Sequence, residues 1–262
     1  SLLIFMSGTA ASLILDIDKS MISNILTVEN VAYYSVAIFI AAVIEFPGRA
    51  MFQIISPLVA KALNDKDDLI LLQLLKKSAN NLLLVSGLLF LLINLNLNDF
   101  YAWTNLGDYT VALEVVLIVS VGKLFTMSMG CLNNIITNSK YYAYVFWFSV
   151  SSAILAVLLN LYLLPLYGII GAAYATLIVI VIINVFKILL VQLKFKIIPY
   201  GWESLLTMGM IILIYLIISK ISFEFDPFVS LVLRSMLIIG VFALLAYWLK
   251  LTVDVQKFFV KI

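Results

Sequence analysis

The strongest constraint on this chain is a series of hydrophobic stretches, each long enough to cross a lipid bilayer. A transmembrane helix needs about 20 mostly apolar residues, and eight stretches of the sequence meet that requirement. They cover Leu2–Asn24, Val31–Leu63, Leu71–Leu95, Tyr109–Thr137, Tyr141–Leu164, Gly168–Leu193, Trp202–Lys220 and Pro227–Leu249. The connections between them are short, so successive helices should run antiparallel. We therefore predict an all-α fold, a polytopic transmembrane helical bundle of about eight spans.

The composition supports a membrane protein and argues against several other classes. Hydrophobic residues make up 65% of the chain and charged residues 11%, whereas roughly a quarter of the residues in a soluble domain are charged. Lipid must therefore cover much of the surface. The net charge of +2 gives no case for nucleic-acid binding. The chain has no histidine and one cysteine, Cys131, so we expect no metal, no cofactor and no catalytic residue.

Lysines gather at alternate connections between the predicted spans. They are Lys61, Lys66, Lys76, Lys77, Lys140, Lys187, Lys194 and Lys196, with Lys250, Lys257 and Lys261 in the C-terminal tail. The intervening connections hold essentially Lys220 alone, at a helix end, with Lys19 as a second exception. The positive-inside rule places the lysine-rich connections in the cytoplasm. Both ends of the chain are then cytoplasmic, as an even number of spans requires.

Several ionisable side chains fall inside the predicted spans, where each costs about 2.5–3.5 kcal/mol near the bilayer centre and therefore needs an explanation. They are Asp16, Asp18, Lys19, Glu45, Arg49, Glu114, Lys123 and Arg234. Glu45 and Arg49 are four residues apart, a spacing that allows them to pair on one helix face. Lys123 lies in mid-span with no carboxylate one turn away, which favours a water-filled cavity. An alternative is that Lys123 pairs across helices with Glu45 or with an aspartate of the first span. We interpret Arg234 as a snorkelling or structural residue.

Helix-breaking and amide residues mark further candidate positions. Pro47 and Gly48 interrupt the second span beside its charged residues. Proline removes a backbone hydrogen bond and bends a helix, and broken helices often line the cavities of transporters. Pro47 and Gly48 are therefore a candidate hinge, with a simple packing kink as the alternative. Asn133 and Asn134 are candidates either for cavity polar groups or for helix–helix contacts.

The order of several short motifs resembles a known family. Asp18-Lys19 late in one span, Tyr34-Ser35-Val36-Ala37 opening the next, and then Pro47 and Ser56-Pro57-Leu58 are similar to the second half of polysaccharide repeat-unit flippases. These proteins belong to the multidrug/oligosaccharidyl-lipid/polysaccharide exporter superfamily. The stretch from Tyr167 to Thr176 looks like the start of the twelfth helix in that family. The resemblance covers the whole chain, from the seventh helix to the fourteenth.

The resemblance implies a domain organisation. Family members have fourteen helices, arranged as two lobes of six helices and two additional helices. Residues 1–197 would form the C-terminal six-helix lobe, and residues 198–262 would form the two additional helices and a short tail. The N-terminal lobe of the same protein is missing from this sequence and is expected as its partner. The chain opens at Ser1 directly in a hydrophobic run, so we expect it to be part of a longer protein.

The resemblance also implies a function. Family members carry oligosaccharide repeat units linked to undecaprenyl diphosphate across the bacterial inner membrane, for the biosynthesis of surface polysaccharides such as lipopolysaccharide. They work as flippases by alternating access and are not enzymes. Arg49 and Lys123 are our candidates for holding the diphosphate, because arginine and lysine bind phosphate groups well. Asp18, Lys19 and Glu45 are candidates for coupling transport to protons or sodium, or for pairing with cations.

Three rival functions stay open from the sequence. A drug or cation antiporter of the same superfamily would share the fold but prefer carboxylates to cations in its cavity. A membrane enzyme is a second rival, although a polymerase would be expected to carry a sizeable outer loop and an acyltransferase a histidine, and the sequence has neither. A structural subunit without a substrate is the third, and it would not be expected to place Lys123 in mid-membrane.

Overall fold

The structure is a computed structural model that describes residues 17–221 and 225–251. These residues form helices and short connections, without a β-strand. After a helical segment at residues 17–25, the elements are α2 (Val28–Ala42), η1 (Val43–Glu45), α3 (Phe46–Asn64), α4 (Asp68–Trp103), η2 (Gly107–Ala112), α5 (Leu113–Ser128), α6 (Leu132–Asn138), α7 (Ala143–Phe195), α8 (Trp202–Ile218) and α9 (Pro227–Trp248). The predicted all-α bundle is confirmed.

Five helical segments of the described residues are long and apolar enough to cross a membrane. They are Val28–Asn64, Asp68–Trp103, Gly107–Ser128, Ala143–Phe195 and Pro227–Trp248, and α8 is a shorter apolar helix. Most of the first predicted span lies outside the described residues. The count is lower than eight also because α7 combines two predicted spans.

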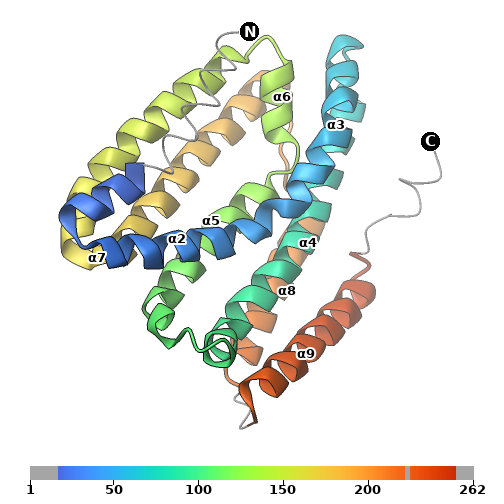
Figure 1. The fold of residues 1–262 in the computed structure, drawn as a ribbon. Coiled ribbons are helices and arrows are strands. Elements are labelled where there is room, and N and C mark those ends of the chain that lie inside the picture. The colour runs from blue at the N-terminus through green and yellow to red at the C-terminus, as the bar shows by residue number, and fades with distance from the viewer. Residues whose placement is uncertain (1–16, 222–224, 252–262) are drawn as a thin grey trace.

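The 53-residue helix α7 is a hairpin of two limbs. Gly168 has φ 60° and ψ −141°, which is not helical, and a positive φ is readily available only to glycine. A Cβ atom on Gly171 would collide with the carbonyl oxygen of Leu163, so the chain doubles back on itself at this turn. At the open end the rings of Tyr141 and Phe195 are 5.8 Å apart. Figure 1 shows the two limbs running antiparallel, as the fifth and sixth predicted spans require.

The second predicted span bends where the sequence places its break. The one-turn 3₁₀ segment η1 separates α2 from α3, and Pro47 stands in the first turn of α3. The carbonyl of Ile44 accepts a hydrogen bond from the hydroxyl of Ser86, at 2.8 Å. A Cβ atom on Gly48 would lie 2.7 Å from the Met127 sulfur, so this glycine allows α5 to approach closely. The break is therefore a packed bend, and its predicted use as a hinge stays a prediction.

Two predicted span boundaries differ from the structure. The fourth span does not continue to residue 137, because Gly130 adopts a φ of 58° and separates α5 from α6. A Cβ atom there would collide with the backbone of Ala79 in α4, so only glycine fits this close approach. The third span does not end near residue 95. Asn94 and Asn96 donate to the carbonyls of residues 90 and 92 of their own helix, and α4 continues to Trp103.

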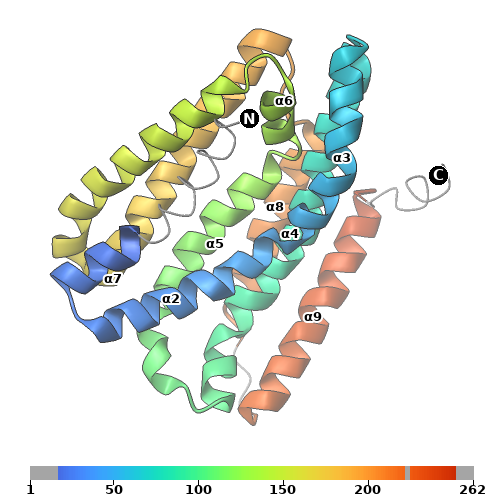
Figure 2. The same ribbon diagram turned by 45° about the horizontal axis from the view of Figure 1, so that its top comes forward.

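The central helix of the bundle is α4. Its apolar side chains pack against α8 and α9 in one cluster that includes Leu91, Ile214 and Phe242. A second cluster joins α2, α5 and α7 and includes Tyr34 and Val116. Figures 1 and 2 show α9 along α4 at one edge of the molecule and the α7 hairpin at the other. The domain boundary near residue 197 stays a prediction, and α8 and α9 pack directly on the helices before it.

The lysine-rich connections meet at one end of the bundle. The ring of Tyr141 lies 5.2 Å from the ammonium of Lys140 and 5.5 Å from that of Lys194, so the α6–α7 connection touches the end of α7. Figure 1 shows the α3–α4 connection at this end as well, and the Gly168 turn and the α4–η2 connection away from it. Successive connections therefore lie at alternate ends of the bundle, as the lysine pattern predicts. The assignment of the lysine-rich end to the cytoplasm stays a prediction.

Candidate functional site

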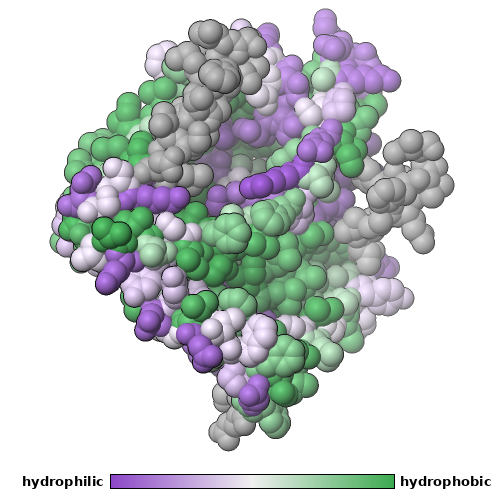
Figure 3. Space-filling view, in the orientation of Figure 1, coloured by the Kyte–Doolittle hydropathy of each residue, from purple (hydrophilic) through white to green (hydrophobic). Residues whose placement is uncertain are grey.

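Hydrophilic side chains gather on one face of the apolar bundle, over α3 and the hollow between α3 and α7 (Figure 3). On η1 and α3 they repeat every three or four residues, a spacing that places those within α3 on one side of the helix. We define the polar face by Glu45, Arg49, Gln53 and Ser56 of η1 and α3, Lys123 and Thr126 of α5, Asn134 and Asn138 of α6, and Asn184 of α7. Hydrogen bonds and one ion pair connect most of these residues across helices.

The ion pair of the polar face joins Lys123 to Glu45. The Lys123 ammonium is 3.0 Å from a Glu45 carboxylate oxygen, and the two side chains are 17% and 23% exposed. Of the two interpretations of Lys123, the pairing across helices with Glu45 is therefore the one found. An ammonium has three donors, and the carboxylate uses one of them. The pair is thus held in mid-bundle without being sealed from the hollow.

The predicted pairing of Glu45 with Arg49 is wrong. Glu45 belongs to the 3₁₀ segment η1 and precedes the first residue of α3, so the two residues do not share one continuous α-helix. Arg49 is exposed, and its guanidinium lies 5.1 Å from the centre of the Phe46 ring. Among the described residues it has no carboxylate partner. The polar face therefore presents a guanidinium that carries an uncompensated charge.

Amide side chains of α6 and α7 extend the polar face, although not all of those singled out in the sequence. Asn133 is exposed and Asn134 is partly exposed. The contact with α3 comes instead from Asn138, whose amide donates to the Ser56 hydroxyl at 3.2 Å. In the second limb of α7, Asn184 donates to Thr126 of α5 at 3.0 Å. A polar residue in mid-span is the signal that could have identified Asn184 from the sequence.

A buried carboxylate, that of Asp18, joins four segments of the chain. Asp18 is 4% exposed. One of its oxygens accepts from Tyr34 of α2 at 3.0 Å and from Thr176 of α7 at 2.9 Å, and the other accepts from Asn160 of α7 at 2.7 Å. No lysine or arginine of the described chain forms an ion pair with Asp18. The amide oxygen of Asn160 is buried and has no hydrogen-bond partner among the described residues.

We call these four residues, Asp18, Tyr34, Asn160 and Thr176, the Asp18 cluster. Asp18 was a candidate from the sequence, but its three partners were not. Tyr34 and Thr176 belong to the motifs that carry the family resemblance, yet nothing in their spacing shows that they meet. Lys19 follows Asp18 and is partly exposed.

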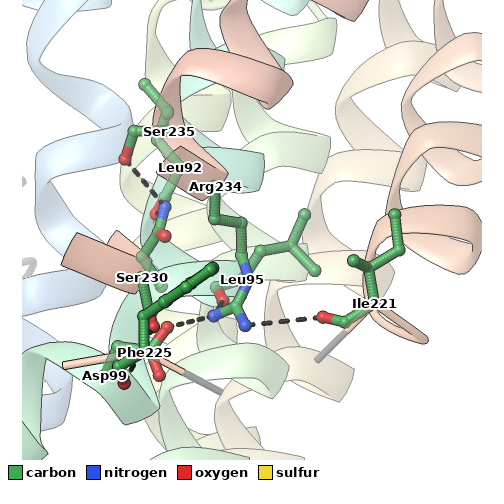
Figure 4. A network of polar contacts seen from close by, with 9 residues as sticks. Leu92, Leu95, Asp99, Ile221, Phe225, Ser230, Arg234 and Ser235 are labelled. Carbon is green, nitrogen blue, oxygen red and sulfur yellow. Dashed lines mark hydrogen bonds and ion pairs between the residues drawn. The ribbon is translucent and has the colours of Figure 1, made fainter. Parts of the chain in front are cut away.

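A second ion pair lies at the far side of α4 and has a different character (Figure 4). The Arg234 guanidinium of α9 pairs with the Asp99 carboxylate of α4. It also donates to the carbonyl oxygens of Leu95, at 2.9 Å, and Ile221, at 3.5 Å. Arg234 therefore ties α9 to α4 and to the chain just after α8, which confirms its structural interpretation. Asp99 lies between the third and fourth predicted spans, so the sequence does not identify it as the partner of Arg234.

No protein-family model, curated protein or solved structure matches this chain. The described residues also contain no group of three or more aspartate, glutamate and cysteine side chains that could hold a metal ion. The function of this chain must therefore be inferred from the fold and from the geometry of the polar face and the Asp18 cluster.

Proposed function

We propose that this chain forms one lobe of a flippase that carries lipid-linked oligosaccharide repeat units across the bacterial inner membrane for surface polysaccharide biosynthesis. The observation that supports the proposal is the polar face, where Arg49 and the Glu45–Lys123 pair lie together within an apolar bundle. Such a substrate presents a diphosphate and a glycan that must pass about 30 Å of hydrocarbon. A lobe with cations and amides on one face gives those groups polar contacts on the way.

Arg49 and Lys123 hold the diphosphate in this proposal. A guanidinium binds phosphate oxygens in a bidentate manner, and an ammonium binds them as a point charge. Arg49 is free of a carboxylate, whereas Lys123 is held by Glu45 until the substrate arrives. Because the pair is partly exposed, a phosphate can approach the two remaining ammonium donors without breaking a sealed contact. Glu45 then keeps Lys123 charged and oriented in the empty protein.

Amides and hydroxyls of the polar face bind the sugar part. Asn138, Ser56, Asn184 and Thr126 are paired with one another across helices, and each pair keeps further donor or acceptor capacity. The missing N-terminal lobe supplies the opposite wall. Rocking of the two lobes around the bound substrate gives alternating access, and both ends of this chain remain in the cytoplasm.

The Asp18 cluster couples transport to protons or sodium in this proposal. A buried carboxylate with only neutral donors gains most from a bound proton or cation, because burial penalises an uncompensated charge. The unpaired amide oxygen of Asn160 and the Thr176 hydroxyl add oxygen ligands of the kind that hard cations prefer. The cluster joins the segment before α2, α2 itself and both limbs of α7, so occupation of the site would change how these elements are held together.

A drug or cation antiporter of the same superfamily is the second candidate, and Asp18 is the observation that favours it. An antiporter needs a carboxylate that exchanges protons for a cationic substrate, and does not need Arg49 or Lys123. The two candidates are separated by which residues transport depends on. Export of lipid-linked sugars should require Arg49 and Lys123, whereas cation efflux should require Asp18 and tolerate their replacement.

The test is surface polysaccharide production in cells that carry variants of the intact protein at its normal expression level. A triple variant, R49Q/E45Q/K123Q, removes both cations without leaving the partly exposed Glu45 carboxylate unpaired. We expect export to be lost while the protein remains in the membrane. Replacing Lys66 and Lys76 by glutamine also removes two cations, but at the end of the bundle, and serves as the matched control. Unimpaired export in the triple variant would contradict the proposed flippase function.

A further inference from the structure

The α7 hairpin carries an apolar groove on its surface that the proposed transport function does not use. The groove has a volume of ≈ 510 Å³. Both limbs line it, with Trp147, Phe148, Ser151 and Leu155 on the first and Ile182 and Phe186 on the second. Trp147 is 63% exposed and Phe186 is 54% exposed. The groove is therefore open to whatever surrounds the bundle.

Two lysines at the open end of the hairpin have no carboxylate partner in the part of the chain that the structure describes. The ammonium groups of Lys140 and Lys194 lie 5.2 Å and 5.5 Å from the centre of the Tyr141 ring. Neither forms an ion pair with a described residue. Cations near an aromatic face are attracted by it, but the ring carries no net charge. Two exposed positive charges thus lie beside one side chain, and together they attract an anion.

Aromatic side chains connect these lysines to the groove. The ring of Tyr141 is 6.3 Å from that of Tyr144, which is 6.4 Å from that of Phe148 in the groove wall. At 1.5 Å per helical residue, positions 141 and 148 are about 10 Å apart along the helix, and the groove lining from 147 to 158 covers roughly a further 16 Å. The lysines therefore stand at one end of the hairpin, and the apolar groove runs along the hairpin away from them.

We propose that the α7 hairpin binds an anionic phospholipid, with its phosphate between Lys140 and Lys194 and an acyl chain in the groove. The charge of the two lysines selects an anionic headgroup over a zwitterionic one. The apolar lining, in which Ser151 is the one polar side chain, fits a hydrocarbon chain. The site shares no residue with the polar face or the Asp18 cluster, so it stands or falls independently of the proposed transport function.

The test uses Trp147 as a reporter inside the groove. In the intact protein, every other tryptophan is replaced by phenylalanine, which in this chain means W103F, W202F and W248F. The protein is reconstituted into vesicles in which either the phosphatidylglycerol or the phosphatidylcholine carries brominated acyl chains, which quench tryptophan emission on contact. At equal mole fraction, we expect quenching that corresponds to at least about fivefold enrichment of the anionic lipid.

Charge variants separate this site from ordinary lipid contact. In the same background, K140Q/K194Q should abolish the preference for the anionic lipid, and K66Q/K76Q should retain it. Equal quenching by the two lipids before substitution would overturn the proposal, as would a preference that survives K140Q/K194Q. Absence of quenching by either lipid would do so too, because it would mean that protein, such as a second copy of the chain, covers the groove.

A second measurement avoids the tryptophan substitutions. Lipids retained by the purified wild-type protein are identified by mass spectrometry and compared with those retained by K140Q/K194Q. We expect the variant to retain several-fold less phosphatidylglycerol than the wild type, with phosphatidylethanolamine unchanged. Equal retention of the anionic lipid by both proteins would contradict the assignment.

Discussion

The two ion pairs of the bundle have similar exposure and different surroundings. Lys123 and Glu45 are 17% and 23% exposed, and Arg234 and Asp99 are 12% and 20% exposed. Arg234 also donates to two backbone carbonyls, whereas the carboxylate is the one hydrogen-bond partner of Lys123 that the described structure contains. The donors of the Arg234 guanidinium thus hold α9, α4 and the chain just after α8 together. Lys123 keeps donors available on the polar face, which also carries a second cation, Arg49.

The exposed fraction of a charged side chain therefore does not by itself distinguish a structural charge from a functional one. The number of donors already satisfied, and the presence of further uncompensated charge nearby, separate them better. The Asp99–Arg234 pair should therefore matter mainly for folding, and the Glu45–Lys123 pair mainly for transport. The following substitutions test that separation, from the largest expected effect on stability to the smallest.

Arg234→Met should cause the largest loss of stability. It leaves the partly buried Asp99 carboxylate without its cation and the carbonyls of Leu95 and Ile221 without their donor. Each polar group left without its partner costs about 1–3 kcal/mol, so the loss of three contacts should exceed the loss of one. Thermal unfolding of the purified protein in detergent measures the loss. The double variant R234M/D99N removes both charges and should recover part of it. A stability of R234M equal to that of wild type would show that the network does not hold α9 in place.

Asp18→Asn should cause the next largest loss of stability. Tyr34, Asn160 and Thr176 all donate to the Asp18 carboxylate. The amide nitrogen of an asparagine at this position is itself a donor and would face at least one of these donors, and such a mismatched buried polar group costs about 1–3 kcal/mol. Transport by D18N should also lose its dependence on the proton or sodium gradient. Transport in everted membrane vesicles, with and without each gradient, measures this. A gradient dependence unchanged from wild type would remove Asp18 from the coupling role.

Lys123→Gln should destabilise the protein less than Arg234→Met does and impair transport more. It leaves Glu45 without its cation, but the carboxylate is 23% exposed and water can reach it, so we expect a loss of about 1 kcal/mol. The double variant E45Q/K123Q should regain the stability of wild type and still fail to transport. A double variant that transports normally would mean that the pair is structural, like the Asp99–Arg234 pair.

Arg49→Gln should have the smallest effect on stability. Its contact in the structure is the exposed cation–π contact with Phe46, and such contacts contribute about 0.5–1 kcal/mol. Transport should nevertheless fall, and Arg49→Lys should restore it in part, because lysine keeps the charge and loses the bidentate fork. Unfolding temperature and substrate export, measured side by side for R49Q and R49K, distinguish this outcome from a purely structural role. Normal export by R49Q would exclude Arg49 from the substrate path.

The sequence predicts the positions of the helices well, because the hydrophobic runs and their breaks are local signals. The turn near residue 168 and the bend at Pro47 are both found where composition places them. Boundaries that depend on tertiary contact are missed. Gly130 separates α5 from α6 because it packs against the backbone of α4, and a glycine within an apolar run does not reveal that contact.

The partners of charged residues are the least predictable part. Glu45 and Arg49 have the spacing of an ion pair, but a short 3₁₀ segment turns Glu45 toward Lys123 instead. Asp99 is assigned to a connection by its polar neighbours, whereas Asn94 and Asn96 donate to carbonyls of α4 itself and the helix continues past Asp99. The Asp18 cluster combines residues up to 158 positions apart, from Asp18 to Thr176. Such contacts follow from the topology of the bundle, which the spacing of residues along one helix does not encode.

Binding of the substrate class is the most direct test of the central claim, which is that the polar face holds the diphosphate of a lipid-linked oligosaccharide. Undecaprenyl diphosphate is titrated into the intact purified protein, and its affinity is compared between wild type, R49Q/E45Q/K123Q and R234M/D99N. We predict that the first variant binds about tenfold or more weakly, and that the second binds like wild type when it is folded. Equal affinity of R49Q/E45Q/K123Q and wild type would contradict the account.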